Sequence, residues 1–324
     1  MKKLLNRYLQ YYSSKNQIYC GSMGNLILNW LHAKDLRIYT SQYDANLIEK
    51  EFSETRQKIT FHAYWNGEFT EKQAFSIKSF LATQNLSFYE LCLWLDETNG
   101  YEVYQSNPLI TQFEGRIRIK PFNFKKEIEG TPFEKIRAFI LGQKDLPAKG
   151  DDFRIITLTK YGGVYFDLDI MFLQDMTPLL LKHEFVYAWE TQPYANSALF
   201  YLRKGSFLAN YIAKKFIKRK AAMPWVLFDY KDTKLGNLFC YPCHFFDPAW
   251  MGIAGKGETF LHSFEDFFTA DKSQYSIHSY REFFPHAYTY HWHNCWKTPV
   301  NENSLYALFN KEFDRIIDNR FSDL

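Results

Sequence analysis

The sequence predicts an α/β protein with a mostly parallel central sheet, formed by one continuous domain that follows an N-terminal helical segment. Residues 60–65 alternate in polarity like a strand, residues 71–84 carry apolar side chains at helical spacing, and residues 88–95 form an apolar run. A strand–helix–strand unit of this kind builds a parallel sheet with helices on its faces. The composition fits a large folded core, since 46% of the residues are hydrophobic and 19% are aromatic.

The other elements follow in chain order. Short apolar runs predict further strands at Arg116–Lys120, Val164–Asp167 and Phe185–Ala188. Helices are expected from near Asp151, after the interruption at Pro147–Gly150, then at Ser206–Lys220, and at Leu305–Ile317 behind an Asn303-Ser304 cap. No internal repeat or low-complexity linker divides the chain after these elements are placed.

The first 57 residues are expected to form the helical segment, and residues 58–324 the main domain. Apolar residues recur there at helical spacing, beginning with Leu4, Leu5, Tyr8 and Leu9. Polar residues interrupt them before the length of a signal peptide or of a membrane span is reached. We therefore expect neither of these segments.

Charge and cysteine content restrict the classes of function. Lys and Arg total 39 against 36 for Asp and Glu, a balance that does not favour nucleic-acid binding. The odd, sparse set of five cysteines argues against a disulfide-held secreted fold and favours the cytoplasm. Cys240 and Cys243 have the spacing of a zinc or redox pair, but no second pair exists to complete a zinc site, so buried thiols are the simpler interpretation.

Two aspartates directly after a predicted buried strand are the first candidates for chemistry. Asp167 and Asp169 flank Leu168, and on an extended backbone their side chains would leave the same side and converge on one ion. Carboxylates suit Mg²⁺ or Mn²⁺, whose shell is normally completed by water and substrate phosphates. Two acids at this spacing also occur on ordinary solvated turns, so the context has to support the site.

The residues upstream supply that context. Asp151, Arg154, Ile155 and Leu158 fall on one helical stripe, which places an acid and a base together above two apolar anchors. An exposed helix-terminal ion pair would look the same. However, Gly162-Gly163 must end this helix and turn the chain into the strand that delivers Asp167, so the helix and the acidic pair are geometrically coupled.

Taken together, Asp151-x-x-Arg154 and Lys160-Tyr161-Gly162-Gly163-Val164-Tyr165-Phe166-Asp167-Leu168-Asp169 resemble the sugar-binding region of D-x-D glycosyltransferases. The segment His62-Ala63-Tyr64-Trp65-Asn66-Gly67 resembles the first-strand motif of this family. His291-Trp292-His293-Asn294-Cys295-Trp296 resembles its His-Trp-x-x-Ser-Trp segment. The three matches occur in the family's order over roughly residues 58–297.

The resemblance implies a fold of the GT-A type, with a single Rossmann-like nucleotide-binding domain, and a role for each matched residue. Asp167, Asp169 and His291 are implied to be ligands of Mn²⁺ or Mg²⁺. Binding of the nucleotide sugar is implied for Tyr64, Trp65, Asp151, Arg154, Asp167 and Trp296, with Trp65 stacking on the base. Asp151 and Arg154 also count as candidates for the reaction centre.

Three weaker candidates complete the sequence analysis. Glu190 and Asn196 lie just past the predicted strand Phe185–Ala188. They are candidates for the reaction centre or the acceptor side, and the alternative is that they belong to a solvated loop. The basic end of the helix Ser206–Lys220, with Trp225 beyond it, would suit peripheral contact with an anionic membrane surface, although a solvated face is the commoner explanation.

The predicted function is a metal-dependent, retaining transfer of a hexose from a nucleotide sugar to a hydroxyl acceptor such as a glycan or polysaccharide. Two alternatives remain open at this point. One is a phosphohydrolase whose D-x-D motif attacks phosphate, and the other is a catalytically silent scaffold that binds sugar nucleotides.

Overall fold

The computed structural model describes residues 58–99, 101–180, 183–189, 192–250, 261–285 and 287–322. The prediction of a helical segment at residues 1–57 lies outside these residues. Within them, no helix is long and apolar enough to cross a membrane.

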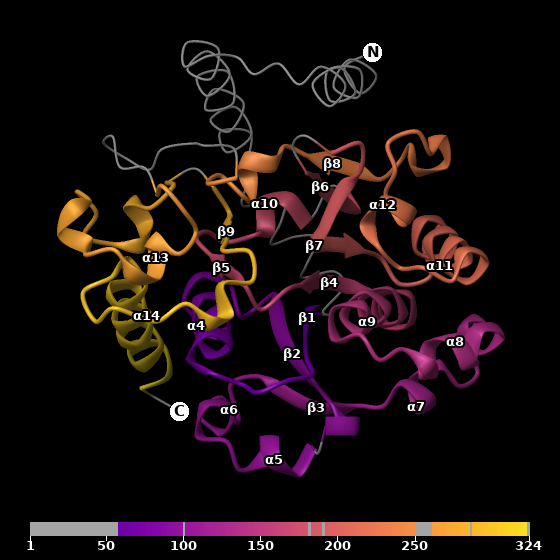
Figure 1. Cartoon of the computed structure of the whole chain (residues 1–324), viewed down its shortest axis with the longest axis horizontal. Helices are drawn as coiled ribbons and strands as arrows, with labels where there is room; N and C mark the ends of the chain where they lie inside the picture. The colour runs from indigo at the N-terminus through magenta and orange to yellow at the C-terminus, as the bar shows by residue number, and fades with distance from the viewer. Residues whose placement is uncertain are drawn as a thin grey trace.

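A seven-stranded sheet in the order β3-β2-β1-β4-β7-β6-β8 forms the centre of the protein (Figure 1). Its strands are β1 (Ile59–Trp65), β2 (Tyr89–Asp96), β3 (Arg118–Phe122), β4 (Gly163–Phe166), β6 (Phe185–Ala188), β7 (Ala195–Leu202) and β8 (Phe239–Tyr241). All neighbours are parallel except the two pairs that β7 makes with β4 and β6. The predicted α/β class with a mostly parallel sheet is therefore confirmed.

Helices cover both faces of this sheet. The long helices are α4 (Glu71–Thr83), α9 (Leu146–Tyr161), α11 (Phe207–Arg219) and α14 (Leu305–Phe321). In Figure 1, α4 and α14 pack together on one face, and α9 and α11 on the other. Shorter helices are α5 (Tyr101–Gln105), α6 (Pro108–Thr111), α7 (Phe124–Ile128), α8 (Arg137–Gly142), α10 (Thr177–Leu180), α12 (Pro224–Leu227) and α13 (Asp266–Thr269).

Strand periodicity divides the core into two clusters, one for each face. Phe61 and Ala63 of β1 point into the cluster that includes α4 and α14, whereas Tyr64 points into the cluster that includes α9 and α11. Successive side chains of a strand leave opposite faces, so the two covering layers are specified by alternate residues.

Helix α9 begins five residues before the expected position near Asp151. Pro147 lies in the first turn of α9, where a backbone N–H would have no acceptor within the helix. The proline is therefore compatible with the start of the helix and does not interrupt the chain before it. Strand β3 also starts two residues later than expected. The predicted Ser304 cap of α14 is confirmed by its bond from the Ala307 N–H.

The turn from α9 into β4 depends on two glycines. Gly162 has φ 70° and ψ −170°, a conformation that only glycine adopts readily, and Gly163 has φ 99°. A Cβ on Gly163 would lie 2.3 Å from the carbonyl oxygen of Thr60 on β1. Gly163 therefore lets β4 pair closely with β1, and Gly162 leaves room for the backbone nitrogen of Lys204, which a Cβ would meet at 2.5 Å.

His62 fastens this turn to the sheet. Its Nδ1 accepts a hydrogen bond from the Trp94 indole at 3.0 Å, and its Nε2–H donates to the Gly162 carbonyl at 3.0 Å. Burial lowers the pKa of His62 from 6.5 to about 3, so the imidazole stays neutral in this role.

A two-stranded sheet stands beside the main one and pairs β5 (Ile170–Phe172) with β9 (Thr289–His291). Together with β7 and β8, these strands were not expected from the sequence. Three of the four contain only three residues, which is too short for a periodic pattern to register.

Replacing Gly163 by alanine should strongly destabilise the protein. The strained φ and the contact with Thr60 should together cost about 3 kcal/mol or more of unfolding free energy, measurable by denaturant unfolding. Gly115→Ala is the matched control, because Gly115 also has positive φ but open space around its Cβ position, and it should cost only about 1 kcal/mol. Equal losses would show that the close approach of β4 to β1 is unimportant.

Stability should fall as pH falls below 6.5, in part through His62. Its pKa is depressed in the folded state, so the stabilisation is complete above the unfolded pKa of 6.5 and is lost as pH falls toward 3. At pH 5 the loss should reach about 2 kcal/mol, as measured by denaturant unfolding across pH. His62→Gln should remove this component, and an unchanged pH dependence in that variant would contradict the assignment.

Candidate functional site

The carboxyl edge of the parallel strands gathers most of the candidate residues. Trp65 ends β1, Asp167 follows β4, Trp189 follows β6, and Asp247 follows β8 and a short 3₁₀ turn. Because β7 runs in the opposite direction, its first residues return to the same edge. Ligands of open α/β sheets bind at this edge.

Arg154 holds two predicted acidic residues together. Its Nη2 lies 3.0 Å from Asp151 and 3.4 Å from Asp167, and its Nη1 donates to the hydroxyl and the carbonyl of Ser197 at 2.6 and 2.9 Å. The guanidinium also lies 4.7 Å from the ring centre of Tyr165, whose hydroxyl donates to Asp167. Only 8% of Arg154 is exposed, so the alternative of an exposed helix-terminal ion pair is wrong and these groups form a buried charge cluster.

The D-x-D motif forms a turn, which corrects the expectation of an extended backbone. The Ile170 N–H donates to the Asp167 carbonyl at 3.2 Å, and Leu168 and Asp169 lie within this turn between β4 and β5. The Asp167 N–H also donates to the carbonyl of Ala198 on β7 at 2.7 Å. The two carboxylates remain neighbours, but they face different partners.

Asp169 faces His291, as the predicted metal site requires. Pairing of β5 with β9 sets Ile170 opposite His291, which leaves Asp169 Oδ2 3.2 Å from His291 Nε2. The Asn294 N–H donates to the same oxygen at 2.9 Å. The other carboxylate oxygen, Oδ1, is buried and has no hydrogen-bond partner among the described residues.

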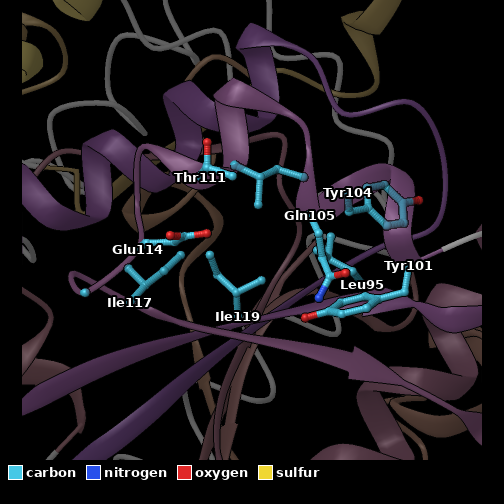
Figure 2. A pocket seen from close by; sticks show the side chains of 10 residues that line it. Leu95, Tyr101, Tyr104, Gln105, Thr111, Glu114, Ile117 and Ile119 are labelled. Atoms are coloured by element: carbon cyan, nitrogen blue, oxygen red, sulfur yellow. The ribbon is translucent and has the colours of Figure 1, made fainter.

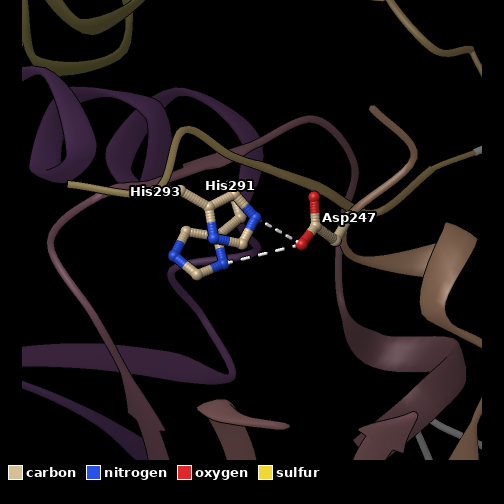
Figure 3. Close-up of side chains that lie close together, drawn as sticks. All are labelled: Asp247, His291 and His293. Atoms are coloured by element: carbon tan, nitrogen blue, oxygen red, sulfur yellow. Dashed lines mark hydrogen bonds and ion pairs between the residues drawn. The ribbon is translucent and has the colours of Figure 1, made fainter. Parts of the chain in front are cut away.

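Asp247 and His293 extend this group, and the sequence analysis missed both (Figure 3). Asp247 Oδ2 lies 2.6 Å from His293 Nε2 and 3.8 Å from His291 Nδ1, and the two imidazole rings stack with centres 3.8 Å apart. One ligand atom from each of the three residues lies within 4.8 Å of the others. Oδ1 of the fully buried Asp247 also lacks a partner among the described residues.

Burial and charge shift the pKa values of this cluster in opposite directions. Burial raises the pKa of Asp167 to about 6, against the opposing effect of Arg154. Burial opposes charge on His291 and Asp169 as well, but their mutual attraction prevails, raising the pKa of His291 to about 9 and lowering that of Asp169. A proton and a divalent cation would compete for His291, since a metal requires its neutral form.

The cluster has more negative than positive charge. Asp151 and Asp167 face Arg154, whereas Asp169 and Asp247 face His291. Asp169 and Asp247 each retain a buried oxygen that has no partner among the described residues. Buried charges are normally paired or bound to a metal. Carboxylate oxygens and imidazole nitrogens therefore make these residues a fitting environment for a divalent cation.

The aromatic candidates divide between surface and core. Trp65 is half-buried, and its ring centre lies 4.9 Å from that of Trp296, so the structure brings these two candidates together. Tyr64 instead points to the opposite face of β1, where it stacks on Phe153 and donates to Asp96. The structure thus does not bring Tyr64 to the site, because adjacent strand residues face opposite ways.

The remaining predictions have different outcomes. Asn196 is not in a loop: it is buried in β7, and its side-chain oxygen accepts a bond from the Ala198 N–H. Glu190 lies outside the described residues. Within the described part of the chain, Cys240 and Cys243 form no disulfide and belong to no metal-binding group.

A pocket of about 240 Å³ opens near the end of β2, beside the Trp65 loop (Figure 2). Tyr104 in its wall donates to the carbonyl of Gly67, two residues beyond Trp65. Tyr101, Gln105 and Glu114 also line it, but none of the residues of the charge cluster does. This pocket is therefore separate from the carboxylates.

Comparison with known protein families indicates a glycosyltransferase enzyme. Residues 33–186 match the family model described as "Glycosyltransferase sugar-binding region containing DXD motif". The match covers slightly less than half of the 324 residues. It includes Asp151 to Asp169, starts within the segment assigned to residues 1–57, and ends before His291.

Several solved glycosyltransferase structures are similar to this one. The PaToxG glycosyltransferase is 16% identical, with 64% of this chain and 78% of that chain covered at a TM-score of 0.44. GlyE of Streptococcus pneumoniae TIGR4, in its apo form, is 11% identical, with 82% and 63% covered at 0.41. A galactosyltransferase, LgtC, in complex with donor and acceptor sugar analogues is 13% identical, with 81% and 96% covered at 0.38. No curated protein matches the chain.

Asp247→Asn should weaken the binding of Mn²⁺ alone. The amide keeps an acceptor for His293 but removes the negative charge, so the dissociation constant should rise about 10- to 100-fold, as measured by calorimetry. Asp232→Asn is the matched control, because Asp232 pairs with Lys215 away from the cluster, and it should leave Mn²⁺ binding unchanged. Equal affinities of the two variants would remove Asp247 from the cation site.

Proposed function

We propose that the chain is a metal-dependent glycosyltransferase that moves a hexose from a UDP- or GDP-sugar to a hydroxyl group of a glycan, with retention of configuration. The observation that carries this proposal is the buried excess of carboxylates at the carboxyl edge of the sheet, two of which have an oxygen with no partner in the part of the chain that the structure describes. A hard cation that also binds a diphosphate would balance this charge.

The metal would be held by Asp169 and His291, and Asp167 would bind it either directly or through a water molecule. Asp247 and His293 would lie on the far side of His291. When bound, Mn²⁺ or Mg²⁺ supplies positive charge that stabilises a departing nucleoside diphosphate. The two nitrogens of the His291 imidazole face Asp169 and Asp247.

Arg154 acts on the donor chiefly through the acids that it holds. Its donors are directed at Asp151, Asp167 and the Ser197 hydroxyl and carbonyl. Fixing Asp151 and Asp167 in this way orients carboxylate acceptors toward the hydroxyl groups of a sugar or ribose. Burial raises the pKa of Asp151, although the adjacent Arg154 opposes this shift.

Trp65 and Trp296 would form the side wall of the nucleotide site. Their rings are in contact at the end of β1, next to β4 in the sheet, and one indole face suits stacking on a planar base. Retention would follow from attack by the acceptor on the face that the diphosphate leaves, through an oxocarbenium-like state.

Two further predictions concern the location of the protein. Lys214, Lys218, Arg219 and Lys220 are exposed at the end of α11, so peripheral contact with an anionic membrane remains a proposal for this surface. The cytoplasmic location also stays a prediction.

Asp169→Ala should abolish metal-dependent binding of the nucleotide. Removing the carboxylate between the motif and His291 should weaken binding of UDP or GDP in the presence of Mn²⁺ by more than about 100-fold, and sugar transfer should be lost with it. Nucleotide binding is measured by calorimetry with and without Mn²⁺, and far-UV circular dichroism checks the fold. Full nucleotide binding by a folded Asp169→Ala protein would refute the proposed function.

A further inference from the structure

A chain of aromatic rings leads away from the cation cluster. His293 contacts Trp250 with ring centres 4.8 Å apart, Trp250 contacts Trp189 at 5.7 Å, Trp189 contacts Tyr194 at 6.0 Å, and Tyr194 contacts Trp225 at 6.1 Å. We name these four residues beyond His293 the aromatic track. They come from three separate segments of the sequence, so no local motif indicates them.

The sheet order places the aromatic track on the opposite side of the motif from Trp65. Trp65 ends β1, Asp167 follows β4, and Trp189 follows β6, while the order of the strands is β1-β4-β7-β6. Tyr194 directly precedes β7, so it lies at the same carboxyl edge. A nucleotide stacked on Trp65 would therefore leave the track free for a second substrate.

The two outer indoles of the track are open to solvent. Trp225 is 54% exposed and Trp250 is 37% exposed, whereas Trp189 and Tyr194 are partly buried between them. Neighbouring rings are inclined to one another by 59° to 85°, so the track offers separate faces and not one flat surface. Exposed aromatic groups that continue from a polar site mark a binding surface.

We propose that the aromatic track binds the sugar rings of an oligosaccharide acceptor, an inference that rests on the proposed function. The C–H groups on one face of a pyranose ring are apolar and pack on an aromatic face, while its hydroxyl groups stay in water. Two exposed indoles separated by Trp189 and Tyr194 fit an acceptor of more than one sugar. Its reacting end lies at His293, next to Asp247 and His291.

A membrane surface is the competing occupant of Trp225, since exposed cations lie at the nearby end of α11. The contact of Trp225 with Tyr194 favours the glycan, because it makes the indole the end of a surface that begins at the reaction site. A tryptophan that only contacts a membrane would not need to be continuous with the reaction site. The two occupants are distinguished by the experiment.

The full-length protein is applied to an array of oligosaccharides with Mn²⁺ and UDP or GDP, and the best retained glycan is then titrated in solution. Trp225→Ala and Trp250→Ala should each weaken its binding about tenfold, and Trp225→Phe, which keeps an aromatic face, should restore most of the affinity. Phe207→Ala is the matched control, because Phe207 is 67% exposed on α11 but outside the track, and it should change nothing.

Nucleotide binding measured on the same samples separates the two hypotheses. Trp225→Ala should leave Mn²⁺-dependent nucleotide binding unchanged. A protein that binds nucleotide but retains no oligosaccharide, or that binds the glycan equally well without Trp225 and Trp250, would overturn the acceptor assignment. So would a Trp225→Ala protein that loses only its binding to phosphatidylglycerol vesicles. Absence of nucleotide binding in the unmodified protein would instead refute the proposed function.

Discussion

Compensation of buried negative charge is the constraint on which this site depends. Asp167 is held by Arg154 and Tyr165, and Asp169 by His291 and the Asn294 N–H. Each carboxylate would be costly to bury alone, so the partners must be in place whenever the fold is formed. Arg154 therefore has a structural role, because it joins α9, the motif and β7 through a single guanidinium.

The backbone positions this charge cluster through close contacts that tolerate little change. Gly163 lets β4 lie against β1, and neutral His62 connects the turn to Trp94 of β2. Pairing of β5 with β9 then joins the motif to a histidine more than a hundred residues away in sequence. The precise distance between Asp169 and His291 is thus a consequence of strand register, which shifts side chains in steps of whole residues.

The sequence was sufficient for the features encoded locally. The first strand–helix–strand unit, the helix with Asp151 and Arg154, and the glycine turn each have a periodic or steric signal, and the structure contains all of them. It was insufficient for Asp247 and His293, since Asp247 follows a three-residue strand and meets the histidines only through tertiary pairing. The turn at Asp167–Asp169 was also missed, because the following strand β5 is too short to reveal where β4 ends.

Charged side chains and aromatic side chains occupy different halves of the carboxyl edge, which suits the two halves to different ligands. Charged groups concentrate around β4 and β9, where the proposed diphosphate and cation would require strong, directional interactions in a buried setting. Indole and phenol rings continue beyond β6, where they are partly exposed and carry no formal charge. A neutral sugar gains little from buried charges, but it can bury one apolar face without losing the hydration of its hydroxyl groups. His293 lies where these regions meet, bonded to Asp247 on one side and packed against Trp250 on the other. A substitution at His293 would therefore disturb both regions. A substitution at Arg154 would affect only the charged region, and one at Trp225 only the aromatic region.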